Sequence, residues 1–70
     1  MKPLQEIADE YTANVEIMKR HREELYRRMQ AEPQTEVRFR LRRSINSITR
    51  AIWQSQEAIR DMREYQRHGK

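Results

Sequence analysis

The 70-residue sequence contains no cysteine, one glycine and two prolines. The first absence excludes disulfides, and the low glycine and proline counts argue against a chain made mainly of turns and loops. Without cysteine the chain cannot be a disulfide-stabilised secreted domain, so we expect it in the reducing cytoplasm. Only His21 and His68 could supply imidazole, and we therefore expect no metal and no cofactor. With so few glycines and prolines, little interrupts regular structure, which favours long helices.

Long apolar runs are also missing. The longest strongly apolar stretch is Ala51-Ile52-Trp53, whereas about 20 apolar residues are needed to span a bilayer. The N-terminus carries Lys2 but not the apolar segment of a signal peptide. We therefore expect a soluble protein without a membrane partner.

Signatures of catalysis are absent as well. The sequence has no glycine-rich phosphate loop, no His-x-x-x-His and no Glu-x-x-His. His21 is flanked by Lys19, Arg20 and Arg22, which indicates a surface position rather than a base held by a carboxylate. We expect neither enzymatic activity nor a small-molecule substrate.

What the sequence does contain is two apolar stripes with steps of four and three residues, the spacing of a coiled-coil seam. The first stripe consists of Leu4, Ala8, Tyr11, Val15, Met18, Arg22, Leu25 and Met29. The second consists of Val37, Leu41, Ile45, Ile48, Ile52, Ser55, Ile59 and Met62. These stripes predict helices over residues 4–31 and 36–67 of a single domain.

The predicted break between the helices is a turn over residues 32–35. Pro33 disfavours helix at Glu32 and lacks a backbone donor, and Thr35 is a candidate N-cap before Glu36. Gly69 is a candidate terminator of the second helix. Two helices joined so closely must be antiparallel neighbours, so the predicted fold is all-α, a coiled-coil-like antiparallel two-helix hairpin.

Folding at Pro33 pairs positions whose numbers add to about 66. Leu25 then lies near Leu41, Tyr11 beside Ser55, and the other seam residues follow in layers. Large residues face small ones in the layers nearest the termini, as facing helices require. Along the surface we expect three acid-first ion pairs, which are Glu16–Arg20, Glu23–Arg27 and Glu24–Arg28.

Apolar side chains off the seam suggest a second interface, because a 70-residue hairpin with one seam is marginally stable alone. The candidate interface residues are Ile17, Tyr26, Phe39 and Trp53. The preferred interpretation is a homodimer forming a four-helix bundle, or a docked partner. The alternative is that these are scattered surface apolars, which are normal and need no partner.

Arginine dominates the surface around the turn. Residues 19–43 hold nine basic and four acidic side chains, a net charge of +5, whereas residues 1–18 carry a net charge of −3. The candidate partner-binding residues are Arg27, Arg28, Arg38, Arg40, Arg42 and Arg43. Their target is an acidic protein surface or a nucleic acid, since Arg suits bidentate contact with carboxylate and phosphate. The third interpretation is a solvated surface that only solubilises the hairpin.

Arg22 falls on the seam. One polar seam residue can fix register and oligomeric state, or its long side chain can extend to the edge and reach water.

The opening MKPLQEIADEY, the central FRLRRSIN and the proline-containing break resemble short two-helix bacterial proteins encoded near phage or other mobile elements. That resemblance implies a bacterial or phage setting and a non-enzymatic role, and it transfers no functional residue. In architecture alone the chain is also similar to the Rop type of helical-hairpin dimer, which binds RNA. The sequence therefore favours a small interaction protein acting as a regulator or inhibitor. A nucleic-acid-binding regulator is the alternative, and a structural bundle subunit is the third hypothesis.

Overall fold

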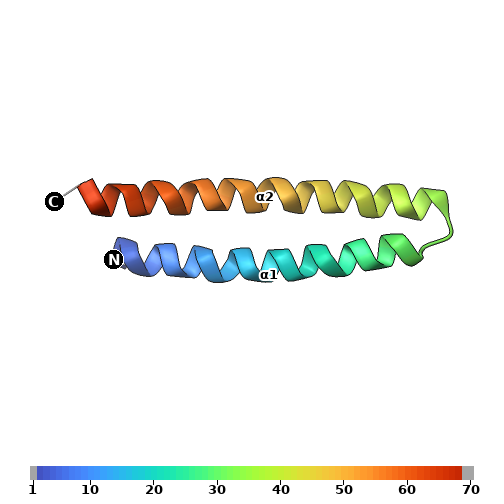
Figure 1. The fold of residues 1–70 in the computed structure, drawn as a ribbon, viewed down its shortest axis with the longest axis horizontal. Helices are drawn as coiled ribbons and strands as arrows, with labels where there is room; N and C mark the ends of the chain where they lie inside the picture. The colour runs from blue at the N-terminus through green and yellow to red at the C-terminus, as the bar shows by residue number, and fades with distance from the viewer. Residues whose placement is uncertain (1, 69–70) are drawn as a thin grey trace.

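The computed structural model describes residues 2–68, which form two helices joined by a short loop. Helix α1 spans Leu4–Ala31 and helix α2 spans Thr35–His68. The helices lie antiparallel and side by side, so the start of α1 and the end of α2 are at one end of the molecule and the loop is at the other (Figure 1). The predicted all-α hairpin is confirmed.

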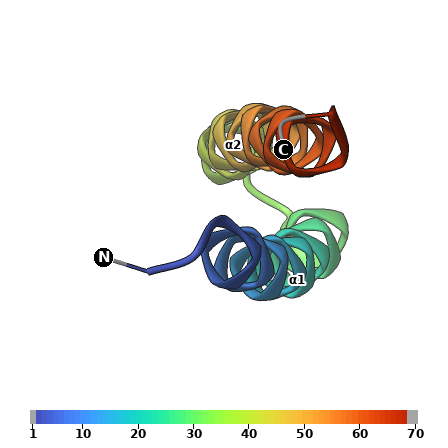
Figure 2. The same cartoon turned by 90° about the vertical axis from the view of Figure 1, so that its left-hand side faces the viewer.

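The hairpin is a thin rod, and its Cα trace measures 55 × 17 × 14 Å. Figure 2, viewed along the rod, shows one pair of helices with no further layer over either side. Each helix therefore has one covered face, and its remaining faces meet solvent. Neither helix contains a segment apolar enough to cross a bilayer within the residues that the structure describes.

Backbone hydrogen bonds define where each helix begins. The amides of Glu6 and Ile7 donate to the carbonyl of Pro3 at 3.0 and 3.2 Å, so Pro3 caps α1 through its backbone. The amide of Arg38 donates to the carbonyl of Gln34 at 3.0 Å, which starts the hydrogen bonding of α2 at Gln34. Thr35 is consequently the first residue of α2, not a turn residue preceding it.

The loop consists of Glu32, Pro33 and Gln34. Glu32 is extended, with φ −84° and ψ 121°, as expected for a residue that precedes proline. Its carboxylate accepts a hydrogen bond from the amide of Gln34 at 3.2 Å. Glu36 lies in the first turn of α2, where a negative charge favours the positive end of the helix dipole. Gly69, the expected terminator of α2, lies outside the described residues.

The core is a single row along the seam. Its buried members are Ala8, Val15, Leu25, Leu41, Ile45 and Ile52. Near the loop, Leu25, Leu41 and Ile45 form a cluster against which Met29, Val37 and Ile48 pack half-buried. The neighbours predicted from folding at Pro33, such as Leu25 with Leu41, are therefore confirmed at this end.

Toward the termini the seam is looser. Tyr11, which the heptad spacing places on the seam, is 41% exposed and lines a surface hollow together with its expected neighbour Ser55. A tyrosine is too large for the narrow space between two helices, and its hydroxyl favours contact with water. Among residues 2–68 no large side chain is fully buried. The hairpin is thus held by few wholly buried contacts.

The surface ion pairs differ from those expected. Glu16 pairs with Lys19 at 3.7 Å, three residues away, and not with Arg20. Across residues 2–68, none of the three predicted acid-first pairs forms within 4.0 Å. Exposed pairs contribute only about 0–1 kcal/mol each, so their side chains are free to adopt other rotamers. One ion pair, Arg63–Asp9 at 3.9 Å, links the two helices near the termini.

Candidate partner-binding surface

The six candidate arginines meet at the loop end of the hairpin. Arg27 and Arg28 are in the last turns of α1, and the other four belong to the first turns of α2. All six side chains are exposed. The antiparallel fold gathers them around the loop, since residues at equal distances from Pro33 lie at the same height on the rod.

None of these six arginines has a carboxylate within 4.0 Å in the described part of the chain. The ion pairs there involve Lys2, Lys19, Arg60, Arg63 and His68. Most of these pairs lie in the half of the hairpin nearer the termini, where acidic residues are frequent. The guanidinium groups at the loop end therefore keep their charge and donors available for an external anion.

The two sides of the helix pair carry different residues. One side, here called the aromatic flank, consists of Tyr26, Met29, Arg38, Phe39, Arg42, Asn46 and Trp53. The other, here called the serine flank, consists of Tyr11, Asn14, Ile17, His21, Ser44, Ser47 and Ser55, bordered by the charged residues Arg20, Glu24, Arg28 and Arg43. Surface hollows lie along both flanks, most of them in the groove between α1 and α2.

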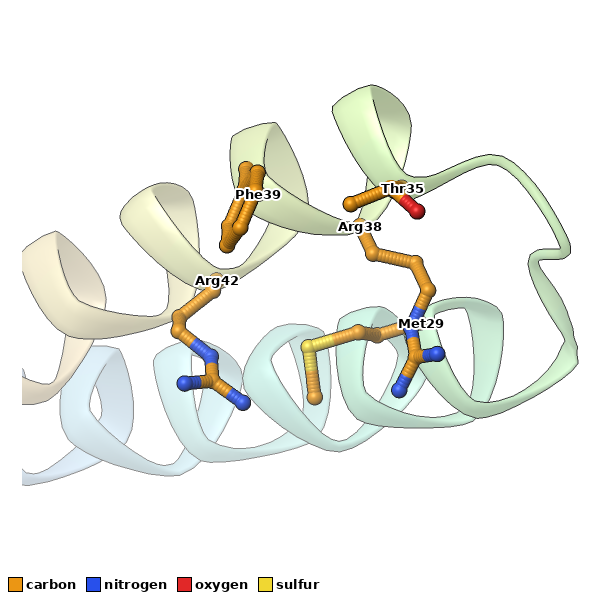
Figure 3. Close-up of a pocket in the computed structure, with 5 residues that line it drawn as sticks. All are labelled: Met29, Thr35, Arg38, Phe39 and Arg42. Atoms are coloured by element: carbon orange, nitrogen blue, oxygen red, sulfur yellow. The ribbon is translucent and has the colours of Figure 1, made fainter.

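A hollow of about 210 Å³ on the aromatic flank lies next to the loop. It is lined by Met29 from α1 and by Thr35, Arg38, Phe39 and Arg42 from α2. Figure 3 shows Arg38 and Arg42 extending from α2 toward α1, with Met29 lying between their guanidinium groups. Phe39 is 62% exposed, so an apolar surface lies beside two unpaired positive charges.

This arrangement suits a ligand that is anionic and partly apolar. The two guanidinium groups offer donors for a carboxylate or a phosphate, and the ring and the thioether offer adaptable apolar contact.

The four candidate interface residues do not form one patch. Tyr26 and Phe39 lie on the aromatic flank, and Trp53 follows the same stripe of α2 because it is 14 residues after Phe39. Ile17 lies on the serine flank, where it lines a hollow with Tyr11, Asn14 and Ser55. All four side chains are exposed, Ile17 at 58% and Trp53 at 61%.

Sequence reasoning missed the contribution of Met29 and Thr35 to the hollow, because it assigned one to the seam and the other to the turn. Met29 is half-buried and serves both the seam and the surface. The signal available in the sequence was that Met29 is the last seam residue before the loop, where the seam ends. Sequence reasoning also missed the serine flank, because its serines and alanines form no distinctive pattern of charge or apolarity in the sequence.

Comparison with known proteins finds no match: no family model, no curated protein and no solved structure is similar to this chain. The resemblance to two-helix proteins of mobile elements stays a prediction from the sequence.

Proposed function

We propose that this chain is a non-enzymatic interaction protein that binds an acidic surface on a partner protein through its arginine-rich loop end. The observation that carries the proposal is that six exposed arginines converge around one loop without an ion pair among the described residues. A cluster of like charges raises self-repulsion in the free protein. An anionic partner relieves that repulsion and gains charge-assisted hydrogen bonds.

The aromatic flank supplies the specific part of the contact. Phe39, with Tyr26 and Trp53 along the same flank, provides large apolar side chains of the kind that dominate binding energy at protein interfaces. Arg38 and Arg42 border Phe39 in the hollow and fix where a carboxylate sits. In a cytoplasmic setting, a protein of this kind regulates or inhibits its partner by covering a functional surface.

Self-association belongs to the same proposal. Over residues 2–68 the hairpin has six buried core residues, and small single-core folds usually need further support such as oligomerisation. A homodimer in which two hairpins form a four-helix bundle supplies a second layer of contacts. Such a dimer presents two copies of the arginine-rich end to its partners and binds with greater avidity.

A nucleic acid is the alternative partner, and the exposed ring of Phe39 between two arginines favours it. Bases stack on exposed aromatic rings while arginines neutralise phosphates. Against it, the six arginines are divided between two helices and surround the rod's end, whose Cα cross-section is 17 × 14 Å. A DNA major groove about 12 Å wide admits one helix and does not admit that end as a whole.

The test compares two double variants of equal charge. Arg38→Glu with Arg42→Glu changes the hollow, and Arg60→Glu with Arg67→Glu makes the same charge change near the termini without removing the Arg63–Asp9 ion pair. Lysate from the source cells is first treated with nuclease. The parent and the variant changed near the termini are then expected to capture the same protein. The variant changed at Arg38 and Arg42 is expected to capture none of it. Equal loss with both variants would mean that net charge alone attracts the partner.

Titrating labelled DNA and RNA across a salt series separates the two partner classes. Binding whose logarithm falls steeply with the logarithm of salt concentration, together with loss of all captured protein after nuclease treatment, would replace the protein partner with a nucleic acid.

A further inference from the structure

The α2 side of the serine flank has an unusual order of charge. At steps of seven residues it presents Arg40, Ser47, Gln54 and Asp61, so that one stripe runs from a positive to a negative charge through uncharged residues. Its neighbouring stripe, seven residues apart in the same way, contains Ser44, Ala51 and Ala58. On α2 the middle of this flank, over residues 44–58, is therefore uncharged and mostly small for about four turns of helix.

The net charge of the whole hairpin also changes from positive at the loop end to negative near the termini. The loop half, residues 19–51, holds ten basic and four acidic side chains, a net charge of +6. The terminal half, residues 2–18 and 52–68, holds four basic and seven acidic side chains, a net charge of −3. Two hairpins with their loops at opposite ends place unlike charges together, whereas two with loops at the same end place like charges together.

We infer that a second copy of this chain packs on the serine flank with its loop at the opposite end. This inference rests on the self-association in the proposed function and specifies its surface and direction. A two-fold axis perpendicular to the rod then relates the copies, and α2 of one copy lies against α2 of the other. Small side chains at Ser44, Ser47, Ala51 and Ala58 let the two helix backbones approach closely.

The stripe fixes the register of this pairing. When Arg40 of each copy faces Asp61 of the other, Ser47 faces Gln54 and Ala51 lies next to the axis. Both α2 helices then overlap for most of their 34 residues. Ile17, which is exposed on the α1 side of the flank, is covered by α1 of the second copy.

The aromatic flank is the less suitable surface for this contact. Arginines border both flanks, but the large exposed side chains of Phe39 and Trp53 on the aromatic flank keep two helix backbones apart. Packing on the serine flank leaves the aromatic flank exposed on both outer sides of the bundle. Partner binding through Phe39, Arg38 and Arg42 therefore uses a different surface from self-association. Three of the other loop-end arginines lie on or beside the serine flank and border the dimer contact: Arg28, Arg40 and Arg43.

Charge reversal tests the register. Arg40→Glu and Asp61→Arg are each expected to weaken dimerisation by roughly tenfold, because each places like charges at two symmetric positions. The double variant is expected to restore it. Within one chain these positions are 21 residues, about 31 Å, apart, roughly three Debye lengths at 0.1 M salt, so rescue requires contact between chains. Sedimentation equilibrium measures the dissociation constant against a subunit mass of 8.7 kDa.

A single introduced cysteine tests the surface, and the chain offers a clean background because it has no cysteine of its own. Ala51→Cys is expected to form a disulfide-linked dimer on mild oxidation, because both Cβ atoms lie next to the axis. Asn46→Cys, on the aromatic flank, is the matched control and is expected to stay unlinked. Circular dichroism is expected to show that both variants remain helical.

Several results would overturn the inference. Cross-linking through Asn46→Cys in preference to Ala51→Cys would move the interface to the aromatic flank. Additive weakening in the double charge variant would reject the register, and a folded parent monomer at all concentrations would reject self-association. The capture experiment with Arg38→Glu and Arg42→Glu has a separate readout, so the loss of either claim leaves the other measurable.

Discussion

Arg22 reaches across the seam to Thr49: its Nη1 donates to the Thr49 hydroxyl oxygen at 3.2 Å. That hydroxyl in turn donates to the carbonyl of Ile45, one turn earlier in α2, at 2.8 Å. Arg22 is therefore half-buried at a seam position, with its stem along the core and its charged end at the edge. The hydrogen bond links α1 to α2 at the edge of the seam.

Replacing Arg22 with Leu is expected to stabilise the hairpin by about 1 kcal/mol, because a leucine fills the seam without removing a charge from water. For a domain of this size that corresponds to a rise in Tm of roughly 4–8 °C, measured by circular dichroism. Arg20→Leu, at an exposed position, is the control and is expected to leave Tm nearly unchanged. A lower Tm for Arg22→Leu would mean that its bond to Thr49 outweighs the added apolar contact.

Ile45→Ala is expected to destabilise the hairpin by about 2–4 kcal/mol, because Ile45 is only 2% exposed and belongs to the loop-end cluster. A fold of this size has only about 3–5 kcal/mol to lose, so the variant is expected to be largely unfolded. Urea denaturation followed by circular dichroism measures the loss.

Phe39→Ala removes an even larger side chain from an exposed position, and we expect its unfolding free energy to stay within about 0.5 kcal/mol of the parent. If the two substitutions proved equally costly, Phe39 would be a structural residue and its assignment to a binding surface would fail.

Trp53 is the sole tryptophan and is exposed on the aromatic flank, so its fluorescence reports on that surface. If self-association uses the serine flank, acrylamide quenching of Trp53 is expected to stay constant as protein concentration rises through the dimerisation range. Addition of a partner that binds the aromatic flank is expected to reduce quenching. Protection that grows with protein concentration alone would place the second copy on Trp53.

Pro33→Ala tests whether the proline or the seam makes the chain fold back. We expect the hairpin to persist with a loss of about 0.4–1 kcal/mol, because the variant mainly frees the unfolded chain while the seam contacts remain. Small-angle scattering is expected to give the parent's dimensions. A rod of roughly 100 Å, the length of one helix over residues 4–68, would show that the proline alone imposes the turn.

Much of the fold could be predicted from the sequence because heptad spacing and a proline are local signals. The steps of four and three residues placed Leu25 and Leu41 in one layer, and the structure confirms that cluster. The start of α2 was misplaced by one residue, because the carbonyl of Gln34, which is not a favoured capping residue by type, accepts the first helical hydrogen bond. Tyr11 was assigned to the core by its spacing, yet its size turns it outward.

The candidate site was less predictable. Counting arginines located the loop end, but Ile17, Tyr26, Phe39 and Trp53 were grouped together because all of them leave the seam. Which flank each one occupies depends on the direction of the neighbouring helix, since a flank is made of side chains from both. Only the packed pair separates Ile17 from the three aromatic residues.

The sequence by itself determined that the chain is helical, that it folds at Pro33 and that its loop end is positive, because periodicity, a missing donor and a charge count are properties of residues near one another in the chain. The tertiary structure decided which arginines stay without ion pairs, that Arg22 bonds Thr49, and that the surface divides into an aromatic and a serine flank. Those facts depend on distances between residues on opposite helices, and such distances are set only when the seam closes.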